Sequence, residues 1–340
     1  MDNDTPTICV PPKDLEVLAE RMRGVTGFVS VLTTPPDSRT CVFSRYFHVR
    51  RVSWLARRLS ELQVSGIHDI DELDWYSWAH DLNRWPFAHN SERGLFNQAA
   101  DIPRYLVEEG VAAHSTNIRQ LQAFLDRDVS TLNPVTSTVY LADVVTGFLE
   151  DPIWLLGALN VSPKIIPAEV AQYLCLPLGD SAFLDQIFHL YKCLRPGLDY
   201  FSYVAMFDSI FSKLALHFIH ARLTHDTVLD SKLLLASSDF EEKRLWIKER
   251  FMRTVIFPYN NDKISRGACI RNELIIPLLP RLGKQLPQFM TRATDESLLA
   301  FAIECSILKQ ECREQLMPDL DYMEREEPEN TLTAFLREVP

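Results

Sequence analysis

The sequence predicts an all-α protein. Only 11 glycines occur among 340 residues, and apolar side chains recur at spacings of three and four, as they do along one face of an α-helix. Hydrophobic residues make up 46% of the chain, which is enough for a large core. We expect one globule: a core at residues 1–160, a helical C-terminal region at 161–340 packed on that core, and an acidic tail at 318–340.

The segment RYFHVRRVSWLARRLSEL, residues 45–62, predicts the first long amphipathic helix. Its apolar stripe consists of Phe47, Val52, Leu55, Leu59 and Leu62. Arginines off this stripe predict a solvent-exposed face, although some of them could instead face a neighbouring subunit or a polyphosphate: Arg50, Arg51, Arg57 and Arg58. His48 follows the start of the stripe, and we therefore expect its imidazole to point inward.

Residues 69–82, DIDELDWYSWAHDL, predict a second helix. Acidic residues at its start suit the positive N-terminal end of a helix, and Pro86 follows its end. His80 and Asp81 then fall in its last turn. Large aromatic side chains in and after this helix are expected in the core: Trp75, Trp78, Trp85 and Phe87.

Residues 137–151, STVYLADVVTGFLED, predict a third helix, which we expect Pro152 to end. Asp143 lies in its middle among apolar residues, and a buried carboxylate of this kind needs a cation or a hydrogen-bond donor. Further helical patterns cover residues 207–223, 240–257 and 296–316.

The charge balance bears on the substrate. The chain has 35 Lys and Arg against 46 Asp and Glu, a formal net charge of -11, which counts against a long nucleic acid as substrate and leaves a single strand open. An anionic substrate then requires a local basic or metal site. The N-terminus has no signal-like segment and no window is apolar enough to span a membrane, which predicts a cytoplasmic protein without membrane attachment.

Four residues on the three predicted helices could hold a metal ion. His48, His80, Asp81 and Asp143 together supply two imidazoles and two carboxylates, ligands that suit a divalent cation. The sequence leaves open whether this cation is Mn, Mg, Fe or Zn.

The order of these residues, in SRYFH, WAHD and LADVV, resembles that of the HD-domain metallophosphohydrolases. Within that superfamily, HDLNRWPFAHNSE is similar to the corresponding segment of the deoxynucleoside triphosphate triphosphohydrolases, the dGTPase-like enzymes. The resemblance implies an HD-domain helical fold with additional C-terminal helices, metal ligation by the four residues above, and assembly into a homo-oligomer.

The resemblance also implies roles for residues around the metal ligands. His89 and Glu92 correspond to an acid-base dyad, although Glu92 could instead cap backbone amides near residue 89. Arg45 and Asp151 match substrate-binding positions of the family. Two further positions differ from the family, which usually has His at Arg84 and an aromatic hydroxyl at Gly147. We expect Arg84 to bind substrate by neutralising a phosphate.

The function implied by the resemblance is hydrolysis of deoxynucleoside triphosphates to nucleoside and tripolyphosphate. Two alternatives remain open at this stage. One is an HD phosphodiesterase or nuclease acting on nucleotides or single strands. The other is a non-catalytic metal-binding protein with a regulatory or interaction role, which the differences at Arg84 and Gly147 favour.

Overall fold

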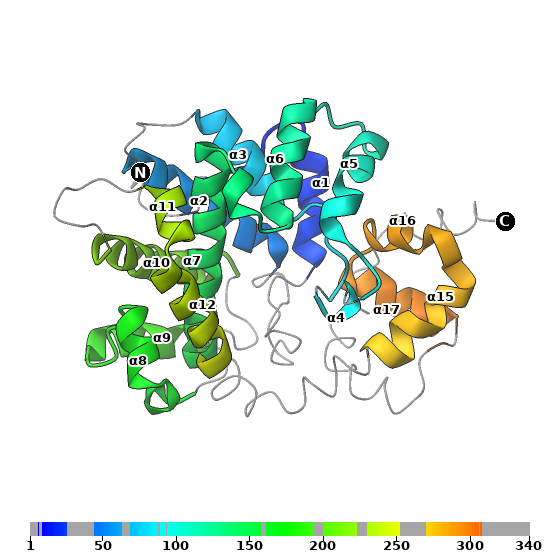
Figure 1. The fold of residues 1–340 in the computed structure, drawn as a ribbon. Helices are drawn as coiled ribbons and strands as arrows, with labels where there is room; N and C mark the ends of the chain where they lie inside the picture. The colour runs from blue at the N-terminus through cyan, green and yellow to red at the C-terminus, as the bar shows by residue number, and fades with distance from the viewer. Residues whose placement is uncertain are drawn as a thin grey trace.

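The fold consists of packed helices. The computed structural model describes residues 6, 9–25, 44–62, 69–87, 89–92, 94–157, 161–193, 200–222, 230–251, 270–305 and 307. These residues form helices and no β-strand (Figure 1), so the predicted all-α class is confirmed. The acidic tail predicted at 318–340 lies outside the described residues.

The α-helices are α1 (Glu16–Arg21), α2 (Arg45–Glu61), α3 (Ile70–Ala79), α4 (His89–Glu92), α5 (Gln98–Glu108), α6 (Ser115–Leu125), α7 (Pro134–Gly157), α8 (Ala168–Tyr173), α9 (Ser181–Cys193), α10 (Tyr200–His220), α11 (Ser231–Ala236), α12 (Ser238–Arg250), α15 (Ile276–Leu282), α16 (Leu286–Met290) and α17 (Asp295–Glu304). Short 3₁₀ turns are η2 (Met22–Gly24), η4 (Val129–Thr131), η5 (Pro163–Ile165) and η8 (Gly283–Gln285), and η7 (Ile270–Ile275) is a π-helical turn. Every predicted helix thus overlaps an observed one.

Helix α7 is longer than predicted. It passes through Pro152 and ends at Gly157. An internal proline costs a helix about 3 kcal/mol, because it removes one backbone donor and crowds the preceding turn. The residues that follow it are buried in the core: Ile153, Leu155 and Leu156. Burial of these three side chains offsets the cost, since each contributes roughly 1.5–3 kcal/mol.

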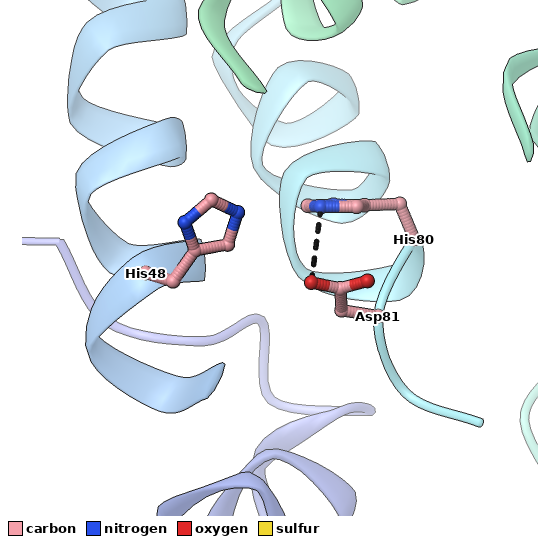
Figure 2. Close-up of side chains that lie close together, drawn as sticks. All are labelled: His48, His80 and Asp81. Atoms are coloured by element: carbon pink, nitrogen blue, oxygen red, sulfur yellow. Dashed lines mark ion pairs between the residues drawn. The ribbon is translucent and has the colours of Figure 1, made fainter. Parts of the chain in front are cut away.

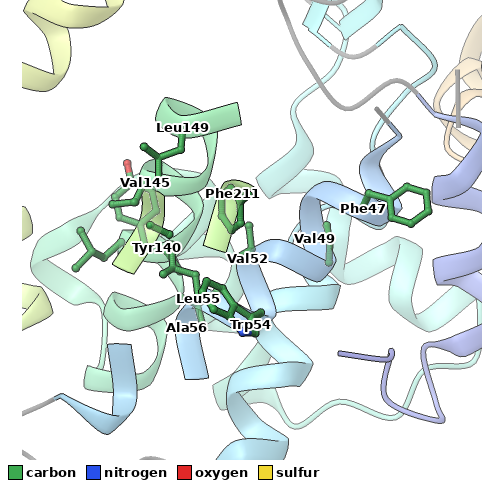
Figure 3. Packing of buried hydrophobic residues seen from close by; sticks show 14 of the residues in the cluster. Phe47, Val49, Val52, Trp54, Leu55, Ala56, Tyr140, Val145, Leu149 and Phe211 are labelled. Atoms are coloured by element: carbon green, nitrogen blue, oxygen red, sulfur yellow. The ribbon is translucent and has the colours of Figure 1, made fainter. Parts of the chain in front are cut away.

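The core forms where α2 packs against α3 and α7, and where α7 packs against α10. Figure 3 shows Val52 and Leu55 of α2 near Val145 of α7 and Phe211 of α10. The ring of Phe211 also lies edge-on to Trp54, with 6.0 Å between the centroids. Helices before and after residue 160 therefore share one hydrophobic core.

A second apolar cluster joins the segment after α3 to the C-terminal helices. Trp85 and Phe87 pack with buried side chains of η7, α15, α16 and α17, and the four aromatic residues predicted for the core are all buried. The backbone amide of Phe87 donates to Asp295, 2.8 Å away. Arg21 donates to backbone carbonyls of Leu82, Arg84 and Ala293. Both ends of the described chain thus hold the turn that follows His80 and Asp81.

Gly147 lies in the middle of α7, and a Cβ added there has no other atom within 4 Å. We expect Gly147→Ala to raise the free energy of unfolding by about 0.5–1 kcal/mol, because alanine loses less backbone entropy on helix formation. Urea unfolding measures the difference. Gly157→Ala is the control, since its Cβ would lie 3.4 Å from the Ile187 carbonyl oxygen and should gain less. If Gly147→Ala did not raise the free energy of unfolding, the space beside the Gly147 Cα would have to be occupied by another group.

Candidate metal centre

Two helices bring three potential metal ligands together. His48 lies in the first turn of α2, and His80 and Asp81 follow the last residue of α3 (Figure 2). One ligand atom of each side chain lies within 4.8 Å of those of the other two, and all three residues are buried. This group could hold a metal ion.

The two ring nitrogens of His80 have different surroundings. Its Nδ1 donates to the backbone carbonyl of Ser77, 2.7 Å away. Its Nε2 is buried, lies 3.5 Å from Oδ2 of Asp81, and has no hydrogen-bond partner among the described residues. A buried ring nitrogen without a hydrogen-bond partner is costly. In the neutral ring this nitrogen has a lone pair, and a metal ion bound by it would remove that cost, so the residues fit a metal ion at this position.

Asp143 of α7 lies beside this group, on its more open side. Its Oδ1 is 3.0 Å from Nε2 of His48 and 3.8 Å from Nε2 of His80, and 29% of its side chain is exposed. Burial alone would raise the pKa of this carboxyl, but the hydrogen bond from His48 and the charge of His80 lower it. Asp143 is therefore an ionised carboxylate that lies next to the group formed by His48, His80 and Asp81, between the buried histidines and solvent.

Asp81 is held by two arginines. Arg45 donates to its Oδ2 at 2.8 Å, and Arg84 donates to its Oδ1 at 3.0 Å. Burial by itself would raise the pKa of Asp81, but Arg45, His80 and Arg84 hold it well below its usual range. The carboxylate is ionised and fixed in orientation, and Arg45 serves as its support.

Glu150 was not predicted as a site residue. Its Oε2 lies 2.8 Å from Nδ1 of His48, and its side chain is fully buried. Burial would lower the pKa of His48, but Glu150 and Asp143 outweigh it and raise this pKa to about 9. A carboxylate behind a metal-binding imidazole fixes the ring so that its other nitrogen faces the metal. The seven-residue spacing from Asp143, two helical turns, was the signal that could have identified Glu150.

The prediction of a solvent-exposed arginine face on α2 is wrong for Arg50 and Arg51. Arg51 is completely buried and donates to Glu150 at 2.9 Å and to Asp208 of α10 at 2.8 Å. Arg50 also pairs with Asp208. Arg51 lies one turn after His48 on the same side of the helix, and carboxylates from two other helices provide its partners. A chain of buried charges thus runs from His48 to α10.

A cavity of about 510 Å³ adjoins this group. It is lined by His80, Arg84, Glu92, Phe96, Asn97, Gln98, Ala99, Phe124, Leu125, Arg127, Tyr140, Asp143 and Lys248. Among the residues predicted to bind substrate, Arg84 lines this cavity. Arg45 and Asp151 are not among its lining residues, and Arg45 contacts Asp81 instead.

Arg84 connects the group to Glu92. Its Nη1 donates to Oε2 of Glu92 at 2.8 Å, while Oε1 of Glu92 accepts from the backbone amide of Trp85 at 3.1 Å. His89 begins α4, and its side chain lies outside the described residues. The acid-base dyad of His89 and Glu92 therefore stays a prediction.

The comparisons with known proteins assign no family. The chain matches no protein-family model, and no curated protein matches it significantly. Within the described part of the chain, no helix combines the length and the apolar character needed to cross a membrane.

Proposed function

We propose that the protein is a metal-dependent phosphohydrolase that acts on deoxynucleoside triphosphates. The observation that supports this proposal most is the buried Nε2 of His80, which has no hydrogen-bond partner among the described residues and faces the carboxylates of Asp81 and Asp143 beside a cavity that Arg84 also lines. Buried metal-binding atoms beside a cation and an open cavity suit a phosphate ester. The resemblance to HD-domain triphosphohydrolases supports the choice of substrate.

The metal ion and the protein side chains would have different roles in this reaction. A divalent ion held by His48, His80, Asp81 and Asp143 would polarise the phosphoryl group and acidify a water molecule. Water oxygen joins the α-phosphorus, the bond from phosphorus to the 5′-oxygen breaks, and a proton reaches that oxygen. The products are nucleoside and tripolyphosphate. We assign the proton transfer to His89, oriented by Glu92, and the neutralisation of phosphate charge to Arg84.

The test is hydrolysis with Mn²⁺ or Mg²⁺ of the four deoxynucleoside triphosphates, the ribonucleotides and a short single strand, with products separated by chromatography. We expect tripolyphosphate release, and a loss of at least about 100-fold in His80→Ala and His89→Ala, because general acid-base catalysis alone contributes about 10²–10⁴-fold. Monophosphate release or strand cleavage would instead identify a phosphodiesterase or nuclease. His114→Ala, an exposed histidine at the start of α6, is the control.

A second candidate is a non-catalytic metal-binding protein. The ion pairs of Asp81 with Arg45 and Arg84 favour it, because two cations already neutralise a carboxylate that would bind the metal. This candidate predicts that metal stabilises the fold while no nucleotide in the panel is hydrolysed.

A further inference from the structure

The cavity beside the candidate metal centre also contains two cations that the proposed chemistry does not use. Arg127 follows α6, and Lys248 lies on α12. Both residues have exposed surface at the cavity, and neither side chain makes a hydrogen bond or an ion pair with the residues that the structure describes. In a chain with a formal net charge of -11, two such cations at one cavity are a local anion-binding feature.

The charges around Lys248 do not neutralise it. Burial against its neighbours lowers its pKa first, and the positive charges of Arg127 and Arg244 lower it further, against the opposing effect of Asp151 and Glu241. Arg244 donates to Glu241 at 2.6 Å, so that carboxylate already has a partner. An anion between Arg127 and Lys248 would relieve the repulsion between these cations.

The backbone of Arg127 supports a role in binding. Its φ is 60°, in the left-handed region that favours glycine. The amides of Arg127 and Asp128 donate to the carbonyls of Phe124 and Ala123 and so end α6, at a position where glycine is the common residue. An arginine here costs roughly 1 kcal/mol relative to glycine. Such a cost is retained where the side chain serves another purpose.

The remaining cavity wall suggests how a ligand would lie. Aromatic rings of Phe124 and Tyr140 pack edge-on with 5.2 Å between centroids, and both line the cavity together with His80 and Asp143 at the metal centre. A ligand with one phosphate can satisfy the metal centre or the pair of cations. A polyphosphate chain offers enough anionic groups for both.

We propose that Arg127 and Lys248 form a second anion-binding position, which binds the phosphates farther from the metal and makes the site selective for polyphosphate esters over monophosphates. This proposal rests on the proposed function, because it assumes that the cavity admits a phosphate ester. It assigns selectivity to two side chains outside the metal-ligand motif.

The experiment is titration calorimetry of the full chain with inorganic tripolyphosphate and with orthophosphate, after chelator treatment so that no metal contributes. We expect tripolyphosphate to bind, and Arg127→Gly and Lys248→Ala each to weaken it about tenfold, since each removes a charge-assisted contact. Arg127→Lys should restore most of the affinity. Lys243→Ala, on the same helix and paired with Asp239, should bind as the unmodified chain does.

The unfolding temperatures of the same variants test whether the substitutions disturb folding. Arg127→Gly should unfold at the same temperature as the unmodified chain or higher, because glycine adopts a φ of 60° without strain. Equal tripolyphosphate affinity in all variants, or no binding to the unmodified chain, would overturn the proposal. Turnover of triphosphates with an unchanged KM in Arg127→Gly and Lys248→Ala would leave the proposed function intact and reject this inference. If tripolyphosphate binding depends on both cations but no triphosphate is hydrolysed, the proposed function is rejected and the anion-binding position is retained.

Discussion

His80→Ala is expected to abolish the stabilisation of the fold by metal. A ligand that binds only the folded chain stabilises it by about 2.7 kcal/mol when its concentration is roughly 100 times Kd. Nε2 of His80 is buried and has no hydrogen-bond partner among the described residues. His80→Ala therefore removes a candidate metal ligand whose nitrogen makes no competing hydrogen bond. Thermal unfolding with and without Mn²⁺, Mg²⁺ or Zn²⁺ measures the effect.

The comparison needs a histidine that is remote from the site. His114→Ala serves this purpose because His114 is exposed and does not line the cavity. It should keep the full metal-dependent rise in unfolding temperature. A rise of the same size in His80→Ala would show that the metal binds elsewhere on the chain, and the candidate centre would then have to be abandoned.

Arg51→Met should produce the largest loss of stability. Its guanidinium is completely buried between Glu150 and Asp208, and removal of one partner from a buried ion pair costs about 3–5 kcal/mol, because the remaining charges lose their compensation. Methionine keeps much of the side-chain volume, so the effect reports on charge more than on packing. Urea unfolding, with far-UV circular dichroism, gives the free energy of unfolding.

Arg58→Met is the matched control on the same helix. Arg58 pairs with Glu61, whose side chain is 51% exposed, and a pair of this kind contributes about 0–1 kcal/mol. Equal losses at Arg51 and Arg58 would contradict the burial of the charge network. A large loss at Arg51 alone would show that the buried ion pairs of Arg51 with Glu150 and Asp208 contribute to the stability of the fold.

The sequence predicted the class of fold and the order of the candidate ligands. Apolar spacing of three and four depends on which side chains lie on one face of a helix, and that information is local. The spacing therefore located α2, α3 and the start of α7, with His48, His80, Asp81 and Asp143 on or beside them. The residues needed for a metal site could be named before any contact between helices was known.

Local patterns misjudged the end of α7 and the environment of the arginines. Proline usually ends a helix, but apolar burial after Pro152 keeps α7 continuous to Gly157. Arg50 and Arg51 were predicted to be exposed to solvent because their partner, Asp208, lies more than 150 residues away in the sequence. No short window of sequence contains both members of such a pair.

Sequence patterns were sufficient to predict a helical protein and to name two histidines and two aspartates as candidate metal ligands. The packing of distant helices was needed to show that Glu150 contacts His48, that Arg45 and Arg84 hold Asp81, and that Arg127 and Lys248 line the same cavity. The physical reason is that helix formation depends on neighbours three or four residues apart, whereas the charges that surround a site come together only when distant helices pack.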